Sequence, residues 1–155
     1  MLSALVQVLA AYLFADLCTG IYHFATDRGW NTRKVVALFQ NHHETNTMDG
    51  FDWQPMWAGV PFLALGLCLG WLELPLASFF IAGGSFGILA QVPHYYAHRR
   101  SRSLRVHRIV RWLQETGLII SPEHHSAHHD GKFDCNFCIL SGWNNWWFNH
   151  VARVL

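Results

Sequence analysis

Residues 121–130 read Ser-Pro-Glu-His-His-Ser-Ala-His-His-Asp and place four histidines at positions i, i+1, i+4 and i+5. On a helix, His124 lies one turn from His128, and His125 lies one turn from His129, because residues four apart share a face. Neutral imidazole is a good ligand for iron, zinc, copper and nickel. The stretch therefore predicts a short helix that offers two pairs of metal ligands.

Three further clusters supply side chains of the same kind elsewhere in the chain. Two of them are pairs four residues apart and the third is another histidine doublet. A mononuclear metal site takes about four ligands, so a set of this size predicts two metal ions. The candidate ligands are His23, Asp27, His42, His43, His94, His98, His124, His125, His128 and His129.

Composition favours one domain, residues 1–155, in a membrane. The chain is 52% hydrophobic and 14% charged, whereas about 25% of residues are charged in a typical soluble domain. A bilayer span needs roughly 20 mostly apolar residues, and three segments approach this, at about 2–25, 56–72 and 75–95. We expect an all-α membrane helical bundle with about three transmembrane helices. The alternative is a small soluble protein, but its core helices would rarely run this long without charge.

The distribution of basic residues orients these spans. Arg28, Arg33 and Lys34 follow the first span, and six arginines lie between residues 99 and 111, whereas residues 71–75 carry one acidic and no basic residue. By the positive-inside rule, both basic segments are cytoplasmic, and the N-terminus and the 71–75 turn are outside. All four ligand clusters then lie at or beyond the cytoplasmic ends of the spans. This topology predicts a metal site on the cytoplasmic face.

The remaining segments suit a membrane surface better than other partners. Residues 106–120 carry apolar side chains at helical spacing between arginines, which predicts an amphipathic helix on the cytosolic surface. Residues 143–148, with three tryptophans, are typical of an interfacial anchor. A nucleic-acid partner is not expected, because the net charge is only +1 and no basic groove accompanies the aromatics. Cys135-x-x-Cys138 alone is a weak zinc or redox motif.

Asp16, Gly20, His23 and Asp27 are spaced 4, 3 and 4 residues apart and share one stripe of a helix. We expect Gly20 to allow close approach of a substrate or of another helix. Asp16 would lie roughly 10 Å deeper in the membrane than His23, where an ionisable group needs a partner. Our interpretation is that Asp16 orients a ligand histidine or lines the substrate channel. A hydrogen bond that packs helices is the alternative.

Six motifs follow one another along the chain: Asp16-x3-Gly20-x2-His23-x3-Asp27, Phe39-x2-His42-His43, His94-x3-His98, Leu113-Gln114, Ser121-Pro122-x-His124-His125-x2-His128-His129 and Cys138-Ile139-x2-Gly142-Trp143-x-Asn145. In carrying these motifs in this order, the chain resembles the Kua-type family of lipid desaturases, which act on plasmanyl lipids or on phospholipid acyl chains. The HHxxHH motif with its downstream Cys-Ile-x-x-Gly-Trp is the most specific part of the resemblance.

The resemblance implies a membrane di-iron centre that uses O₂ and two external electrons to remove two hydrogens from a lipid chain. Zinc or manganese would fit the same ligands. The implied partners are a membrane lipid and an electron-transfer protein, of the ferredoxin or cytochrome b type, with its reductase. The family usually carries a further histidine after the first doublet. Here Asp49 or Asp52 is the candidate replacement, or the site has one ligand fewer.

Three other functions are compatible with the sequence. A hydroxylase on the same scaffold would begin with the same abstraction of hydrogen. A membrane haem protein would place paired histidines on facing helices within the bilayer, and a metal-binding protein without turnover would use the same ligands. Tyr95, beside His94, is a candidate for lining the active site, although such aromatics more often pack. His107 and His150 match no motif and are interpreted as ordinary interfacial histidines.

Overall fold

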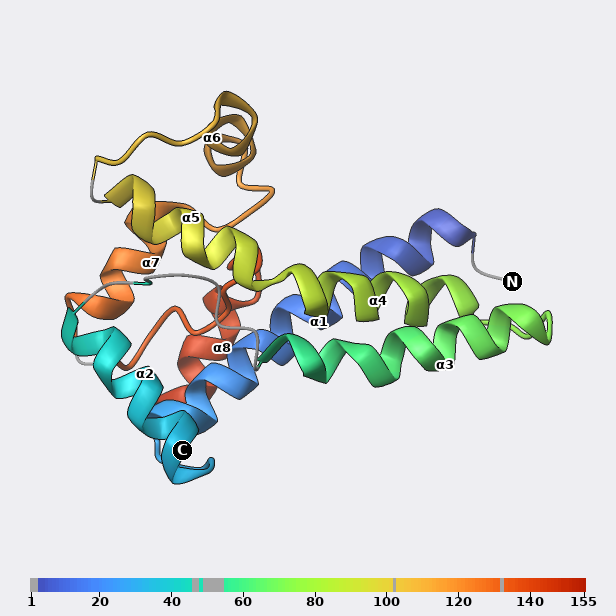
Figure 1. The fold of residues 1–155 in the computed structure, drawn as a ribbon, viewed down its shortest axis with the longest axis horizontal. Coiled ribbons are helices and arrows are strands. Elements are labelled where there is room, and N and C mark those ends of the chain that lie inside the picture. The colour runs from blue at the N-terminus through green and yellow to red at the C-terminus, as the bar shows by residue number, and fades with distance from the viewer. Residues whose placement is uncertain (1–2, 46–47, 49–54, 102, 132) are drawn as a thin grey trace.

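The computed structural model describes residues 3–45, 48, 55–101, 103–131 and 133–155, and within these ranges every regular element is helical. Two regions are evident in Figure 1: a rod of long helices, and a cluster of shorter helices gathered at one end of it. The elements are α1 (Ala4–Asp27), α2 (Arg33–Thr45), the 3₁₀ helix η1 (Pro55–Ala58), α3 (Gly59–Trp71), α4 (Ala77–Leu89), α5 (Gln91–Ser101), α6 (Arg108–Glu115), α7 (Pro122–His129) and α8 (Asn145–Ala152).

The rod consists of α1, α3 and α4, with α4 packed against both of the others. Helix α1 has 24 residues and is therefore about 36 Å long. The Ser3 hydroxyl caps its start by accepting the Val6 N–H. Glycines allow the α3 and α4 backbones to approach closely, because a Cβ at Gly66 or Gly84 would overlap the facing backbone.

Among the described residues, one helix, α1, is long and apolar enough to cross a membrane by itself, and α3 is a shorter apolar helix. The first predicted span corresponds to α1, and the second to η1 with α3. The third predicted span is wrong as a single helix, because α4 ends at Leu89 and α5 begins at Gln91. Pro93 lacks an N–H and cannot donate to the Leu89 carbonyl, which explains the break. The three-span bundle stays a prediction.

Helix α6 is shorter than the amphipathic helix predicted over residues 106–120. It begins where the His107 ring caps the Ile109 N–H, and it ends just before Gly117, which has a φ of +70°. His107 thus has a local structural role. The apolar side chains of Ile109 and Trp112 are exposed on this helix, as expected for a helix that lies on an apolar surface.

The C-terminal segment holds the cluster of shorter helices on the last turns of α1. Phe137 is buried against Phe24 and against Phe148 of α8. Cys138 fits closely over Gly20, where a Cβ would overlap its sulfur. The Asn145 side chain accepts the Cys138 N–H at 2.9 Å. This packing fixes the chain that follows α7 and sets the position of α7 relative to α1.

Candidate metal centre

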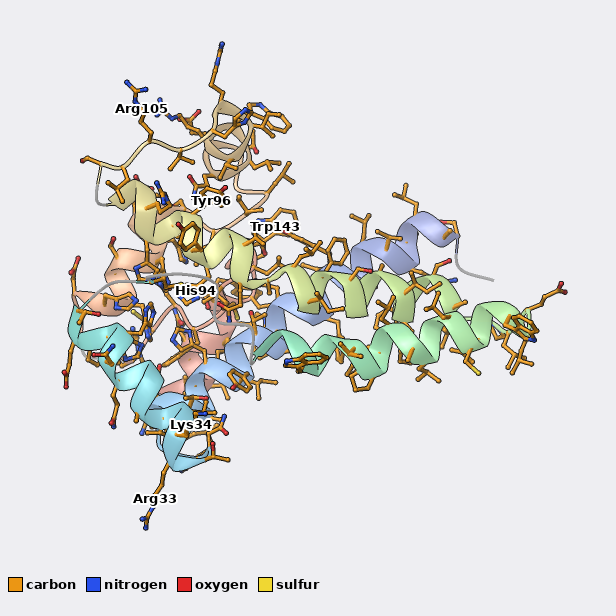
Figure 2. All side chains as sticks on the ribbon, viewed as in Figure 1. Arg33, Lys34, His94, Tyr96, Arg105 and Trp143 are labelled. Atoms are coloured by element: carbon orange, nitrogen blue, oxygen red, sulfur yellow. The ribbon has the colours of Figure 1, made fainter. Side chains whose placement is uncertain are left out.

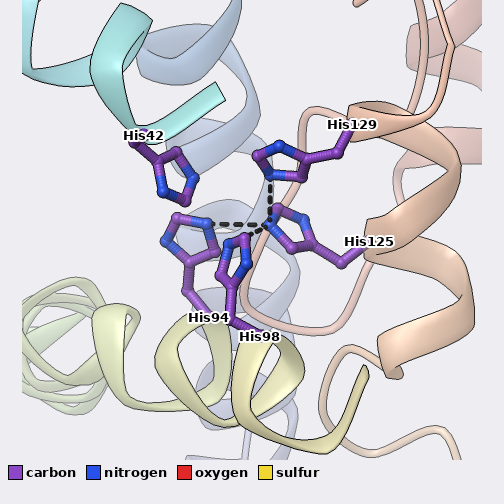
Figure 3. Close-up of side chains that lie close together, drawn as sticks. All are labelled: His42, His94, His98, His125 and His129. Carbon is purple, nitrogen blue, oxygen red and sulfur yellow. Dashed lines mark hydrogen bonds between the residues drawn. The ribbon is translucent and has the colours of Figure 1, made fainter. Parts of the chain in front are cut away.

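Helices α1, α2, α5 and α7 bring nine of the ten predicted ligands together in two groups. Within each group, one ligand atom per residue can be chosen so that all of them lie within 4.8 Å of one another. The five-histidine group, drawn in Figure 3, contains His42, His94, His98, His125 and His129. The carboxylate group contains His23, Asp27, His43 and His128. Two ligand groups of this size agree with the prediction of two metal ions.

The local sequence explains why α7 supplies three ligands. Ser121 caps the helix by accepting the His124 N–H at 3.1 Å, and Pro122 occupies the first turn. At about 100° per residue, the side chains at 125, 128 and 129 fall within an arc of about 100°. That arc faces α5 and α1, and all three side chains are buried.

His124 lies outside both groups, contrary to the expectation that the whole HHxxHH motif binds metal. Its side chain is exposed, and its ring lies beside Gly142. The helical arc explains this, because position 124 lies about 140° from position 129. Of the two expected one-turn pairs, His125 and His129 stay together in the five-histidine group. His128 belongs to the carboxylate group, and its expected partner His124 does not.

The His42–His43 doublet is divided between the two groups. Adjacent side chains on a helix diverge by about 100°, so His42 points to the five-histidine group and His43 to the carboxylate group. The His43 ring is stacked on Phe133, with centroids 4.4 Å apart and planes 4° apart. Helix α2 thus contributes one ligand to each group.

The nitrogen atoms of the five-histidine group are spaced as ligands of one cation. His125 Nε2 lies 3.0 Å from His94 Nε2, 2.8 Å from His98 Nε2 and 3.0 Å from His129 Nε2. A neutral imidazole has one proton for two nitrogens, so these contacts cannot all be hydrogen bonds. Ligands at about 2.1 Å from one ion, at right angles to each other, are about 3.0 Å apart. The spacing therefore fits a metal ion among converging lone pairs.

Hydrogen bonds at the opposite ring nitrogens fix which atom can bind metal. His94 Nδ1 lies 2.9 Å from the buried Gln91 Oε1. His23 Nδ1 lies 3.1 Å from the Phe137 carbonyl oxygen, and His128 Nδ1 lies 2.5 Å from that of Cys135. Because carbonyl oxygens only accept, each Nδ1 carries the proton and leaves an Nε2 lone pair for a metal.

The carboxylate group contains a buried anion that lacks hydrogen-bond donors. Both Asp27 oxygens are buried without a hydrogen bond from any described residue. The nearest ring nitrogens are the Nε2 atoms of His23, His43 and His128, at 3.6, 3.5 and 3.4 Å. Two of these, on His23 and His128, present lone pairs to the carboxylate. Such an arrangement is repulsive unless a cation lies between the groups, so it fits a metal ion.

Burial keeps His43, His125 and His129 neutral. Desolvation, followed by the charge of His128, lowers the pKa of His43 to about 3. Desolvation and neighbouring imidazoles also lower the pKa of His125 and His129 far below the ordinary value. Burial opposes the charged form of an imidazole. These rings are therefore unprotonated near neutral pH and present lone pairs to a metal.

Asp16 has the partner that its depth in α1 requires, but this partner is not a ligand histidine. One carboxylate oxygen accepts the N–H groups of Ser141 and Gly142 at 2.8 and 3.0 Å. The other accepts the backbone N–H of Asn144 at 3.1 Å and its side-chain amide at 3.0 Å. Asp16 thus ties residues 141–144 to α1. These contacts favour the alternative interpretation, in which Asp16 forms hydrogen bonds that pack segments of the chain together, over direct orientation of a ligand histidine.

The other predicted site residues lie outside the two ligand groups. Gly20 accommodates Cys138, as described above. The Tyr95 hydroxyl accepts a hydrogen bond from Arg99 at 2.7 Å, and His150 is exposed on α8. Cys135 and Cys138 are unpaired thiols. Asp49 and Asp52, proposed as replacement ligands, lie outside the described residues.

Sequence reasoning missed Gln91, Phe133 and the carbonyl partners of His23 and His128. Gln91 had a usable signal, because it lies three residues before His94 and therefore on the same helix face. The carbonyl partners of His23 and His128 gave no signal in the sequence, because every residue has a backbone carbonyl. Figure 2 shows His94 pointing into the space between the helices, whereas Arg33 and Arg105 project outward on opposite edges.

Comparison with known proteins identifies the family of this chain. Residues 12–153 match the sequence profile described as the lipid desaturase domain. The chain belongs to the lipid desaturase family. It is 33% identical over 147 residues to fatty acid desaturase 4-like 1, chloroplastic, of Arabidopsis thaliana, covering 87% of this chain and 49% of that protein. No solved structure matches the chain.

Two further relatives are also named as desaturases. Fatty acid desaturase 4, chloroplastic, of Arabidopsis thaliana is 33% identical, with 88% of this chain and 45% of the relative covered. Plasmanylethanolamine desaturase of Myxococcus xanthus is 26% identical, with coverages of 89% and 53%. The chain thus spans about half the length of these relatives.

Proposed function

We propose that the protein is an O₂-dependent desaturase that introduces a double bond into an alkyl or acyl chain of a membrane lipid. The observation that carries this proposal is the pair of adjacent, buried ligand groups in a member of the lipid desaturase family. The relatives are named as desaturases of a fatty acid and of plasmanylethanolamine. The substrate class is therefore either a phospholipid acyl chain or the alkyl chain of an ether lipid.

The five-histidine group would hold one iron ion and the carboxylate group the other, and zinc or manganese would fit as surrogates. When bound, the two ions would supply the activation of O₂ that an unreactive C–H bond requires. The lipid loses two hydrogen atoms, which deliver two electrons and two protons. A further two electrons from an electron-transfer protein and two protons from solvent complete the reduction of O₂ to two molecules of water.

The chain's own residues prepare the site for this reaction. Gln91 and the Phe137 and Cys135 carbonyls hold three ligand rings in the orientation that directs Nε2 inward. Burial of His125 and His128 excludes water from the ligand groups. Eight neutral imidazoles and a single carboxylate leave the bound ions with most of their positive charge, which favours negatively charged oxygen species.

Several observations support placement of α1 across a membrane with the metal centre at its inner surface. Helix α1 is long and apolar enough to span a membrane, and the helices α2, α5 and α7, which carry the other ligands, lie at the end of α1 away from the N-terminus (Figure 1). Exposed tryptophans occur where the rod joins the cluster of shorter helices, including Trp57 and Trp143, as at a membrane interface. By the positive-inside rule, the basic segments support a cytoplasmic position for this end and an outside position for the N-terminus.

Lipid mass spectrometry of cells with and without the gene tests the reaction. The proposal expects a lipid two daltons lighter that appears only with the gene and only in the presence of O₂. A lipid sixteen daltons heavier would identify the hydroxylase instead. Bound metal without any altered lipid would indicate a metal-binding protein, and a Soret band in the purified protein would indicate haem.

Thiol labelling in intact cells tests the topology. A cysteine that replaces Glu73 should react with an impermeant reagent, whereas one that replaces Arg105 should react only after the cells are opened. Both side chains are exposed, so the difference reports the side of the membrane. The reverse pattern would contradict placement of the metal centre in the cytoplasm.

A further inference from the structure

A cavity of about 490 Å³ lies between α1, α4 and the start of α3. Its walls are predominantly apolar, and none of the residues that line it is Asp, Glu, Lys or Arg. A cavity of this kind provides no partner for a charged ligand, so its occupant must be uncharged where it lies inside.

The cavity is long and runs along the rod. On α1 its lining residues extend from Phe14 to Ala25, which corresponds to about 17 Å of helix, and on the opposite side they extend from Gly83 to Gln91, or about 12 Å. Its volume corresponds to roughly 16 groups of the size of a water molecule, at about 30 Å³ each. A linear chain of more than ten methylene groups has this length and volume.

One end of the cavity reaches the metal centre. His23, a member of the carboxylate group, lines the cavity, and so does Gln91, whose side chain contacts His94. No member of the five-histidine group lines the cavity. A molecule inside it would therefore meet the carboxylate group first.

We propose that this cavity binds a saturated alkyl chain of a membrane lipid and directs it to the His23 side of the metal centre. The inference rests on the proposed function, because it assigns a place to the chain that the enzyme would desaturate. The occupant follows from three observations together: an uncharged apolar lining, a length and volume that suit a linear chain, and continuity with the ligand groups.

Two cysteines provide a matched test. Cys18 lines the cavity from α1, whereas Cys68 lies on α3, is also exposed, and does not line it. One protein would carry Cys68→Ala with Cys135→Ala, which leaves Cys18 reactive. Its control would carry Cys18→Ala with Cys135→Ala, which leaves Cys68 reactive. Cys138 is buried and stays in both.

Each protein is treated with hexyl methanethiosulfonate, which transfers its hexylthio group to the thiol, forms a disulfide and releases methanesulfinate. In the protein that keeps Cys18, modification should lower desaturation at least tenfold and leave bound metal constant. Dithiothreitol, which reduces the disulfide, should restore activity. In the control protein, which keeps Cys68, the same modification should change desaturation less than twofold. Full activity of the Cys18 protein after complete modification would overturn the proposal.

A second measurement needs no turnover. In a fluorinated surfactant, without O₂ or reductant, a phospholipid with saturated sixteen-carbon chains should slow modification of Cys18 at least tenfold but leave Cys68 unaffected. Equal rates with and without lipid would overturn the cavity assignment even if the protein desaturates lipids. Protection without any altered lipid in cells would retain the cavity and overturn the proposed function.

Discussion

The two ligand groups lie side by side yet differ in charge and surroundings. The five-histidine group consists of imidazoles alone, whereas the carboxylate group adds the charge of Asp27 to three imidazoles. The carboxylate group also reaches the apolar cavity through His23, and the five-histidine group does not. A carboxylate favours a more highly charged ion than imidazole alone does. If both groups bind metal as proposed, the two positions are not equivalent, and the proposed substrate would approach the one with the carboxylate.

The largest effect is expected from His125→Ala, which removes the ring at the centre of the five-histidine group. Bound iron should fall by about one ion per chain, and desaturation should fall by more than the roughly 100-fold loss typical of an outer hydrogen-bond partner. Elemental analysis and lipid mass spectrometry measure both quantities. His124→Ala is the matched control, because this neighbour is exposed and outside both groups. Equal metal content in the two variants would contradict the assignment of His125.

Asp27→Asn is the next test, because it keeps the volume of the side chain and removes the charge that distinguishes the groups. We expect the ion of the carboxylate group to be lost and the five-histidine group to keep its own, so that bound iron falls to about half. Desaturation should fall with it. Titration of metal-free protein with iron measures the number of sites. Two sites of unchanged affinity would show that the carboxylate does not distinguish the two positions.

A smaller effect is expected from Gln91→Leu, which removes the acceptor for Nδ1 of His94, a member of the five-histidine group. Loss of such a partner typically reduces metal affinity or activity by 10- to 100-fold. Gln91→Glu keeps an acceptor oxygen at this position and should recover most of the metal affinity. Iron affinity of the three proteins separates this role from packing. Equal losses in both variants would contradict the hydrogen-bond explanation.

Asp16→Asn should have the smallest effect on chemistry, because Asp16 contacts neither ligand group. The amide has one acceptor oxygen in place of two, so the 141–144 segment loses hydrogen bonds to a charged group, worth about 1.5–3 kcal/mol each. The Tm should fall, and activity per bound metal should stay within about twofold. A 10- to 100-fold loss of activity per metal would instead support our first interpretation, that Asp16 orients a ligand.

Local sequence patterns predicted much of the fold, and the structure brings together nine of the ten candidate ligands. The start of α7 follows from Ser121 and Pro122, and the pairing of His125 with His129 follows from helical spacing. The break between α4 and α5 was missed because absence of charge says nothing of backbone continuity, although Pro93 marked the place. The position of His124 outside both groups was not foreseen, because an isolated helix does not show which arc faces its neighbours.

The sequence by itself determined the candidate ligands, which are histidines and one aspartate at ligand spacing, and the apolar segments with basic residues beside them. Spacing along a helix is a local property, and it is encoded within four or five residues. Tertiary structure decided how the ligands divide into two groups, because each group draws on at least three helices. It also decided the partners of Asp16 and His23, which lie more than 110 residues away in the chain. Such contacts depend on how the helices pack, and no local pattern records that packing.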